Sequence, residues 1–396
     1  MGIKSAIHWI LACCMGILSL QTNAQSTVNP SGSTVVLFLP LHLDSIYDAQ
    51  GQYRLKRYEF PRFVSAPLEF YQGFKEALDS LRKSPGDFTL RVIDTRSESS
   101  PMRSLFQNDS ITKANLWLFF GNAAESRVIA EASKNHKVPV ININLPNDAG
   151  IENNPFYFLW NNTLETQCEG IYRHWQQYYP LEDIILVRKK GSIEDRILNH
   201  LKEVDKNTRS VPIRYRILET ADSITTNALA ALMDSTKQTV LFGASLDERF
   251  ARNLATATTD LVKTGYKVEL MGMSTWENIK ELNTTRFRNT KITIPTPFFY
   301  RRADDLSKRL QSKFLEINYS KPSDTYLRGY EIAWMLHALL QKNKDLAEVL
   351  PGPKKLLFGE INWQPVIDTA TLHLHYFENK KIYFVKRMEG SVLSVR

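Results

Sequence analysis

The chain has 396 residues, of which 43% are hydrophobic and 23% are charged, as in an average soluble globular protein. This length is too great for one ordinary domain and suits two. No repeat of fixed period occurs, which argues against a solenoid. The net charge of +8 comes from basic residues scattered among 42 acidic ones, so the sequence predicts a solvated surface and no nucleic-acid partner.

The first 24 residues are predicted to be a cleaved signal peptide. Lys4 supplies a positive charge, 6–20 is largely apolar, and Thr22-Asn-Ala24 offers small residues before a cleavage site. No second apolar run long enough to span a membrane follows, so the predicted location is the periplasm, without a transmembrane span in the mature chain. Two alternatives stay open: an uncleaved anchor, and a lipid anchor at Cys13, which has only twelve residues before it.

Cys168 is the one cysteine that remains after removal of the signal peptide, so no disulfide within the mature chain is predicted. Leu164, Cys168, Ile171 and Trp175 recur at helical spacing and form one apolar face. A buried, inert thiol is therefore expected rather than a nucleophile.

Short β-rich runs alternate with longer helical patterns through the first two thirds of the chain. The run 35–39 is continuously apolar, as in a strand buried on both faces. The predicted strands are 35–39, 89–94, 116–120, 138–143, 156–160, 184–187, 213–218, 240–242, 268–271 and 292–294. The predicted helices are 65–81, 125–135, 164–178, 193–204, 228–233 and 248–263. This alternation predicts parallel sheets with helices on both faces, because each crossover needs a helix to return the chain.

The last third of the chain has a different pattern. Two helices are predicted over 306–317 and 323–340. The chain then closes with a predicted β-hairpin, in which 372–377 and 382–385 flank a turn over 378–381.

No catalytic or metal-binding signature is present, so the sequence predicts a protein that is not an enzyme and has no cofactor. The chain lacks a G-x-S-x-G elbow, a Walker A loop and an H-E-x-x-H motif. His373 and His375 share one face of a predicted strand and could begin a metal site. No further histidine or cysteine lies nearby in sequence, and a solvent-exposed face is the preferred interpretation.

Four segments together resemble the type I periplasmic binding proteins, the family of branched-chain amino-acid binding proteins and receptor ligand-binding regions. They are an opening strand and helix with Gly73-x-x-x-Ala77, a second strand ending at Asp94, a late helix with Tyr326-x-x-Gly329-Tyr330, and the closing segment 358–363. The resemblance covers about 33–396. The strand end Leu39-Pro-Leu-His-Leu-Asp44 also resembles exported bacterial proteins whose relatives can carry a peptidoglycan-binding LysM module, which is not visible here.

This resemblance implies an α/β protein with two doubly wound parallel-sheet lobes joined by three crossovers. Lobe 1 is expected at 33–150 plus 286–345, and lobe 2 at 151–285 plus 346–396. The linkers are then expected near 146–154, 282–290 and 343–351, where Pro, Gly and Asn suit a hinge.

Ligands of open parallel sheets bind beyond the carboxyl ends of the strands, where helix N-termini direct N–H groups outward. These positions supply the predicted ligand-binding residues, each of which has a structural alternative as a helix cap or turn former. They are Asp94, Arg96, Gly121, Asn122 and Ala123 on lobe 1, and Ser192, Gly243 and Ser245 on lobe 2.

The sequence therefore predicts a solute-binding protein that closes two lobes over a small ligand, namely an amino acid, a short peptide or a cell-wall fragment. Its expected partners are this ligand and a membrane transporter or envelope protein. The alternative is a scaffold or regulator of cell-envelope synthesis that uses the same fold without a ligand.

Overall fold

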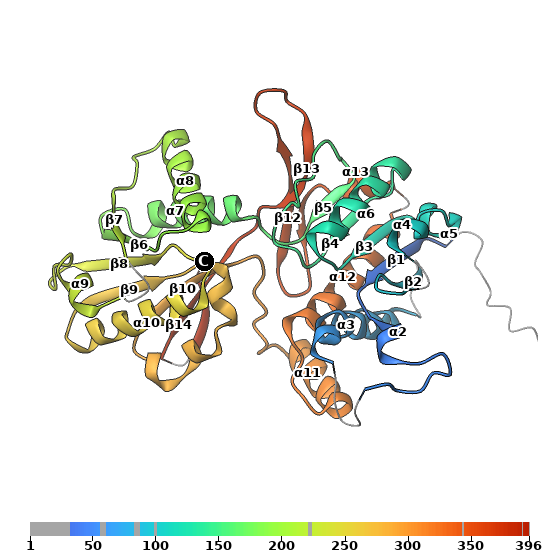
Figure 1. The fold of residues 1–396 in the computed structure, drawn as a ribbon, viewed down its shortest axis with the longest axis horizontal. Coiled ribbons are helices and arrows are strands. Elements are labelled where there is room, and N and C mark those ends of the chain that lie inside the picture. The colour runs from blue at the N-terminus through green and yellow to red at the C-terminus, as the bar shows by residue number, and fades with distance from the viewer. Residues whose placement is uncertain are drawn as a thin grey trace, which may run out of the picture.

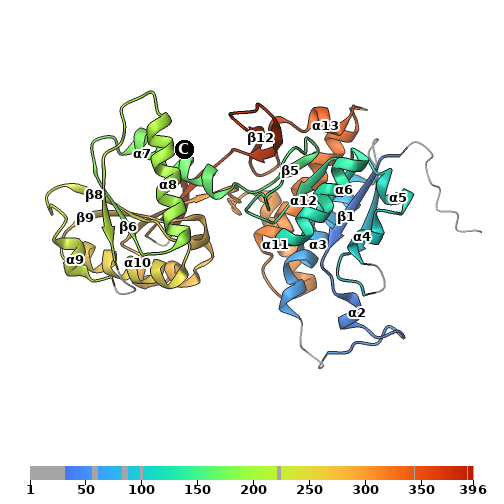
Figure 2. The same ribbon diagram turned by 45° about the horizontal axis from the view of Figure 1, so that its top comes forward.

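The structure is a computed structural model that describes residues 32–55, 61–82, 88–98, 101–220, 224–342, 344–389 and 391–395. Two α/β lobes lie side by side and are joined by crossing segments of the chain (Figure 1, Figure 2). The predicted signal peptide and the alternative lipid anchor at Cys13 lie outside the described residues. Within the described part, no helix combines the length and the apolar character that crossing a membrane requires.

The first lobe is built on an eight-stranded sheet in the order β11-β12-β13-β5-β4-β3-β1-β2. The neighbours from β13 to β2 are parallel, and the pairs β11–β12 and β12–β13 are antiparallel. The strands are β1 (Thr34–Leu39), β2 (Thr89–Asp94), β3 (Leu116–Phe119), β4 (Val140–Asn142), β5 (Tyr157–Leu159), β11 (Gly352–Lys355), β12 (Glu360–Ile367) and β13 (Leu374–Asn379).

Helices cover both faces of this sheet. Alternate residues of β1 point to opposite faces, so Val35 and Leu37 pack in the core with α3 and α12, whereas Val36 and Phe38 pack in the core with α6. The helices of this lobe are α2 (Leu43–Ile46), α3 (Ser65–Leu81), α4 (Met102–Leu105), α5 (Asp109–Thr112), α6 (Ala123–His136), α11 (Asp305–Asn318), α12 (Asp324–Leu340) and α13 (Leu346–Val349).

The second lobe is built on a seven-stranded sheet in the order β15-β14-β10-β9-β8-β6-β7. Its strands are parallel except for β14 and β15, which form antiparallel pairs. The strands are β6 (Asp183–Arg188), β7 (Tyr215–Glu219), β8 (Gln238–Gly243), β9 (Lys267–Met271), β10 (Lys291–Thr296), β14 (Tyr383–Met388) and β15 (Ser391–Val395). The helices are α7 (Leu164–Tyr178), α8 (Ser192–Asn207), α9 (Thr226–Ala230) and α10 (Glu248–Lys263), with short 3₁₀ turns η2 (Ser274–Asn278), η3 (Lys280–Asn283) and η4 (Thr285–Phe287).

The predicted fold class is confirmed: two lobes with mainly parallel sheets are joined by three crossings. The lobe boundaries, however, differ from those expected at 150, 286 and 346. The strand β5 belongs to the first sheet because it pairs with β4, and β10 belongs to the second because it pairs with β9. The segment β11–β13 also completes the first sheet. The crossings therefore lie at 160–163, 297–300 and 380–382, which corrects the expected linkers.

The predicted closing hairpin is also corrected. The two predicted strands correspond to β13 and β14, which belong to different sheets. The expected turn between them is the third crossing. Each of the two strands has antiparallel partners in its own sheet: β13 pairs with β12, and this pair projects above the two lobes in Figure 1, whereas β14 pairs with β10 and β15.

Candidate functional site

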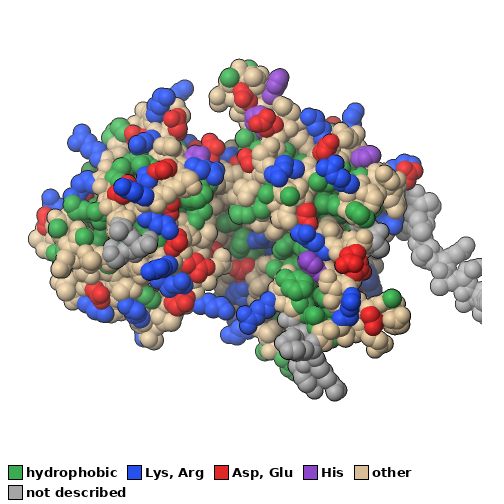
Figure 3. Space-filling view, viewed as in Figure 1, with side chains coloured by type: hydrophobic (Ala, Val, Ile, Leu, Met, Phe, Trp, Pro, Cys, Tyr) green, Lys and Arg blue, Asp and Glu red, His purple; other side chains and the backbone are tan. Residues whose placement is uncertain are grey.

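The space between the lobes is the candidate site. The parallel strands of both sheets end toward the three crossings, so the loops that follow them line the facing sides of the lobes. Figure 3 shows the surface hollowed between the lobes, with acidic and basic side chains along the hollow. The loops after β1–β5 form the first wall, and those after β6, β8 and β9 form the second.

On the first wall, Asp94 organises the backbone of its own lobe. Its carboxylate accepts hydrogen bonds from the N–H groups of Leu41, His42 and Leu43 at 2.8–3.1 Å, and from the N–H group of Arg96 at 2.9 Å. The Arg96 guanidinium pairs with Glu125 at 3.0 Å. Asp94 therefore holds the loop after β1, and each group already has a partner within the lobe.

The N-terminus of α6, which contains the predicted site residues Gly121, Asn122 and Ala123, is closed by a capping box. The Asn122 side chain accepts from the N–H group of Glu125 at 3.0 Å, and the Glu125 carboxylate accepts from the N–H group of Asn122 at 2.9 Å. The Gly121 N–H group donates to the Asn144 side chain at 2.9 Å. Ala123 is the first residue of the helix. A carboxylate of the chain thus occupies the place expected for an anionic ligand.

The second wall is closed in a similar way. Ser192 begins α8, and the Ser245 hydroxyl donates to the buried Glu194 carboxylate at 2.5 Å. The Trp276 ring lies so close to Gly243 that an added Cβ atom would come within 2.3 Å of it. The Trp276 indole N–H also donates to the Ser245 carbonyl oxygen at 2.9 Å. Ser245 is fully buried, so ligand recognition by this hydroxyl would require the loop to move.

The eight predicted residues therefore occupy the expected strand ends, three on one loop and the others distributed over both walls. The side-chain polar groups of four of them, Asp94, Arg96, Asn122 and Ser245, are used inside each lobe. The spacing Asn122-x-x-Glu125 was readable from the sequence as a capping box. The position of Trp276 over Gly243 had no signal in the sequence.

Two residues that sequence reasoning missed lie at the carboxyl edge of the first sheet. The Asn161 amide donates to the Asn144 carbonyl oxygen at 2.8 Å, and the Arg328 guanidinium donates to the Ile143 carbonyl oxygen at 2.7 Å. Asn161 and Arg328 are 8% and 7% exposed. Within the described residues, the Asn161 Oδ1 acceptor and the Arg328 Nε donor have no hydrogen-bond partner. Buried polar atoms of this kind are uncommon and identify a place for an additional polar group.

Arg328 also fixes the second crossing to the first lobe. Its guanidinium lies 4.0 Å from the centre of the Phe298 ring. One turn further along α12, the buried Glu331 carboxylate accepts from the Tyr300 hydroxyl at 2.8 Å. Burial raises the pKa of Glu331 to about 7. The crossing is therefore anchored at Phe298 and Tyr300 by one cation and one carboxylate of the same helix.

Glu277 of the second lobe has a charged environment drawn from both lobes. Burial raises the pKa of its carboxyl group to about 7, and Asp324 adds to this effect. A hydrogen bond with Thr296 and the charges of Arg387 and Arg328 oppose it. Since Asp324 and Arg328 belong to α12 of the first lobe, the charge of Glu277 is sensitive to the distance between the lobes.

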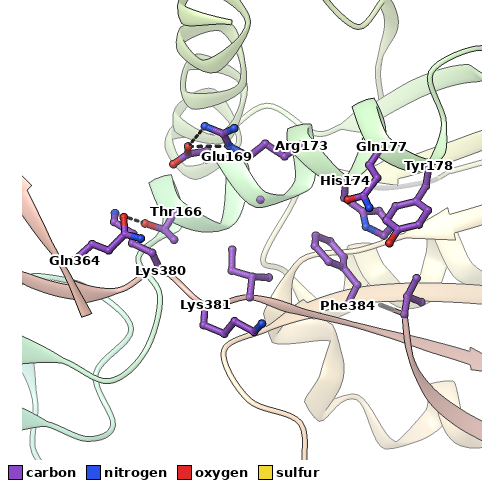
Figure 4. A pocket seen from close by; sticks show the side chains of 13 residues that line it. Thr166, Glu169, Arg173, His174, Gln177, Tyr178, Gln364, Lys380, Lys381 and Phe384 are labelled. Atoms are coloured by element: carbon purple, nitrogen blue, oxygen red, sulfur yellow. Dashed lines mark hydrogen bonds and ion pairs between the residues drawn. The ribbon is translucent and has the colours of Figure 1, made fainter. Parts of the chain in front are cut away.

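A second hollow of about 510 Å³ lies between α7 and the third crossing. Figure 4 shows its polar end, where the Lys380 ammonium lies between Thr166 and Gln364, and its aromatic end, where His174 and Phe384 meet. The Lys380 ammonium donates to the Thr166 hydroxyl at 2.6 Å and pairs with Glu378 at 2.7 Å. This hinge groove is flanked by both lobes and lies outside the strand-end walls.

The described residues contain no group of three His, Cys, Asp or Glu side chains that could hold a metal ion. The Nε2 atom of His375, one of the two histidines considered for a metal site, lies 3.9 Å from the Asp368 Oδ2 atom. Cys168 is fully buried, as predicted, and burial raises the pKa of its thiol to about 12. A thiol with this pKa is not a nucleophile near neutral pH.

No protein-family model matches the chain, and no curated protein sequence matches it. Solved structures do. A putative branched-chain amino acid ABC transporter from Rhodospirillum rubrum is similar at a TM-score of 0.66 and 12% identity, over 92% of this chain and 100% of that one. A substrate-binding protein of an ABC transporter from Desulfitobacterium hafniense, in complex with Leu, is similar at a TM-score of 0.56 and 12% identity. The match covers 92% of this chain and 100% of that one.

LpoA from Haemophilus influenzae is similar at a TM-score of 0.58 and 13% identity, over 92% of this chain and 58% of that one. This chain thus spans little more than half of LpoA. Sequence identities of 12–13% show that the fold is shared, and the ligands and partners of these proteins do not carry over to this chain. The sheet order, the three crossings and these similarities together show that the chain has the two-lobed fold of the type I periplasmic binding proteins.

Proposed function

We propose that the protein is a periplasmic solute-binding protein that closes its lobes over a small ligand without transforming it. The observation that carries this proposal is the pair of unpartnered buried atoms at the first wall, Asn161 Oδ1 and Arg328 Nε. Both lie at the carboxyl edge of a parallel sheet, where ligands of this architecture bind. Closure would bring the second wall, including Glu277, toward them.

An amino acid or the end of a short peptide suits this pair. Asn161 Oδ1 accepts hydrogen bonds, as an ammonium group requires, and Arg328 Nε donates one, as a carboxylate requires. The other predicted residues would act indirectly, because Asp94, Asn122 and Ser245 hold the loops that form the walls. A cell-wall fragment with a peptide stem carries the same groups. The proposed partner is a membrane transporter that recognises the closed form.

Thermal unfolding of the chain from Gln25, which keeps every described residue, tests the proposal against panels of amino acids, dipeptides, sugars and muropeptides. A ligand at about 100 times its dissociation constant adds roughly 2.7 kcal/mol to the free energy of unfolding. Small-angle scattering of the same samples should show a smaller radius of gyration, because closure brings the lobes together.

A variant pair locates the site. Asn161→Leu removes the acceptor and should abolish the shift in melting temperature, whereas Asn227→Leu, on the distant helix α9, should leave it unchanged. A ligand that binds both variants equally well would place the site elsewhere.

We keep a second function, a scaffold or regulator of cell-envelope synthesis, on the observation that the chain's own carboxylates already engage polar groups of both walls. Glu125 does so at the N-terminus of α6, and Glu194 at the Ser245 hydroxyl. The similarity to LpoA, which concerns the fold, is compatible with it. The absence of any shift in the panel, together with an unchanged radius of gyration, would favour this function over solute binding.

A further inference from the structure

The outer edge of β15 differs from the other sheet edges of the molecule. β15 pairs with β14 and is the last strand of its sheet, so one side of its backbone has no strand neighbour among the described residues. Its sequence, Ser391-Val-Leu-Ser-Val395, contains neither a charged residue nor a proline. Val392 and Leu393 are 49% and 54% exposed.

The other three edge strands carry the devices that prevent pairing with foreign strands. β11 (Gly352–Lys355) contains a proline and two lysines. β7 contains Arg216, which pairs with Asp183, and β2 contains Arg91. An unprotected apolar edge on a molecule that protects its other edges indicates a surface kept free for a partner strand.

Hollows are present at both ends of β15. A hollow of about 50 Å³ at its beginning is lined by Leu282, Phe287 and Val392. A hollow of about 790 Å³ at its end is lined by Phe299, Leu356 and Ser394. Val392 and Ser394 share one face of the strand, because side chains alternate. A strand added beside β15 would therefore direct alternate side chains on this face toward the two hollows, the arrangement by which sheet edges select peptides.

The charges near the beginning of β15 specify the side chain that suits the smaller hollow. Arg288 and Arg387 line it, and no acidic residue does among the described residues. Arg387 donates to the Glu277 carbonyl oxygen at 2.7 Å, while its Nε and Nη1 atoms have no hydrogen-bond partner in the described part of the chain. Both atoms are buried, so a carboxylate in this hollow would meet the guanidinium charge of Arg387 and would bond to these donors once the side chain turns toward it.

From these contacts we propose that β15 is a docking edge for an extended segment of a partner protein, which adds a strand to the second sheet and places an acidic side chain beside Arg387. A second copy of this chain suits the edge less well. Antiparallel pairing of two β15 strands about Leu393 would place the Arg387 hollow of each copy beside the larger hollow of the other, which Arg301, Lys355 and Lys381 line. Two carboxylates also line it, but Asp304 already caps α11 and Glu360 already pairs with Lys381, and β15 itself offers no carboxylate.

The position of the edge connects this docking to the lobes. The larger hollow is lined by Leu356 of the first lobe and by Tyr383 and Ser394 of the second. It shares Lys381, Ile382 and Val395 with the hinge groove. The end of an added strand would therefore contact both lobes, and its affinity depends on the angle between them. This inference is independent of which ligand, if any, occupies the space between the lobes.

The test begins with a random heptapeptide library displayed on phage and selected against the chain from Gln25. We expect enriched peptides with one Asp or Glu and apolar residues at alternate positions. A synthetic peptide of the best sequence should lose at least about tenfold in affinity when its acidic residue becomes the amide, because a charge-assisted hydrogen bond is lost. Arg387→Gln should remove this difference, and Arg309→Gln, on the exposed side of α11, should preserve it.

Backbone pairing is tested separately with an N-methylated form of the same peptide, which should not bind. Val392→Pro and Leu393→Pro form a further pair, because adjacent N–H groups of a strand point to opposite sides and only one of them faces outward. The proline that replaces the outward-facing N–H group leaves the pairing with β14 intact, so that variant should keep the wild-type melting temperature and should no longer bind the peptide. Failure to enrich peptides, undiminished binding after N-methylation, or a dimer of the chain that the peptide does not dissociate would each overturn the proposal.

Discussion

At the scale of single residues, acidic side chains of this protein hold the loops that line the space between the lobes. Asp94 accepts from N–H groups of two loops, Glu125 occupies the helix end where a ligand was expected, and Glu194 accepts from the Ser245 hydroxyl. The positions were predictable, because strand ends can be read from the alternation of elements. The contacts that cover Ser245 and Gly243 were not predictable, because they are made by Trp276, which is distant in sequence and close only after folding.

Asp94→Asn should lower the free energy of unfolding by about 2–3 kcal/mol, because an amide presents one acceptor and two donors to N–H groups that need acceptors. Chemical denaturation measures this change, and hydrogen exchange should show faster exchange at Leu41, His42 and Leu43. The control is Asp48→Asn, whose carboxylate accepts two N–H groups in an exposed turn, from Gln50 and Gln52. An equal loss in both variants would contradict the special role of Asp94.

Two buried carboxyl groups make stability depend on pH. The pKa values of Glu277 and Glu331 are raised to about 7, so the folded state binds their protons more tightly than the unfolded state. Their contribution is present below the unfolded pKa of 4.5 and is lost as pH rises through 7. His174, with its pKa lowered to about 4 by burial, contributes fully above its unfolded pKa of 6.5 and loses this contribution as the pH falls toward 4, so it adds little to the change in stability between pH 6.5 and 8.

From pH 6.5 to 8 the free energy of unfolding should therefore fall by roughly 1–2 kcal/mol. Glu331→Gln, which keeps an acceptor for the Tyr300 hydroxyl, should remove about half of this slope. Urea titrations at several pH values measure it. An unchanged slope in Glu331→Gln would show that this carboxyl group does not titrate in the window.

At the scale of elements, the two glycine segments on which the family resemblance rested form one contact. An added Cβ atom on Gly73 of α3 would lie 1.9 Å from the Tyr326 carbonyl oxygen, and one on Gly329 of α12 would lie 2.1 Å from the Phe70 carbonyl oxygen. The two helices approach so closely because neither glycine has a side chain at the crossing. Sequence reasoning identified both segments but had no means of knowing that they touch.

Gly73→Ala should destabilise the protein by about 1–3 kcal/mol or more, because the obstacle is backbone and cannot rotate away. Gly170→Ala on α7 is the matched control. Its Cβ atom would meet only the Ile382 side chain, with the flexible Cδ1 atom at 2.5 Å, and alanine favours a helix. Thermal unfolding of both variants is the measurement. A similar melting temperature for the two would contradict the close crossing of α3 and α12.

At the scale of the whole molecule, the class of fold was predictable and the allocation of strands to lobes was not. The residues of a buried strand such as β5 or β10 would suit either sheet equally well, so the strand's composition does not show which neighbours it pairs with. The turn-rich segment after β4 suggested a boundary, yet the chain returns to the same sheet at β5. Only long-range pairing, invisible in a single sequence, decides this.

Because each lobe has its own core, calorimetric unfolding should show two transitions rather than one. Gly73→Ala should lower the first-lobe transition and leave the other within about 1 °C. Trp276→Phe, in the core of the second lobe, should lower the second-lobe transition and leave that of the first lobe unchanged. A single transition that moves with both substitutions would mean that the lobes unfold as one unit.

The allocation of the last strands bears on how the chain is made. The first sheet needs β11–β13 and the second needs β14 and β15, so both are completed by residues 352–395. A ribosome adds about 5–20 residues per second, so for many seconds the nascent polypeptide holds two unfinished sheets with open edges. Both lobes therefore keep open sheet edges until residues 352–395 have been made, and factors that shield such edges in the cell would act on the two lobes together.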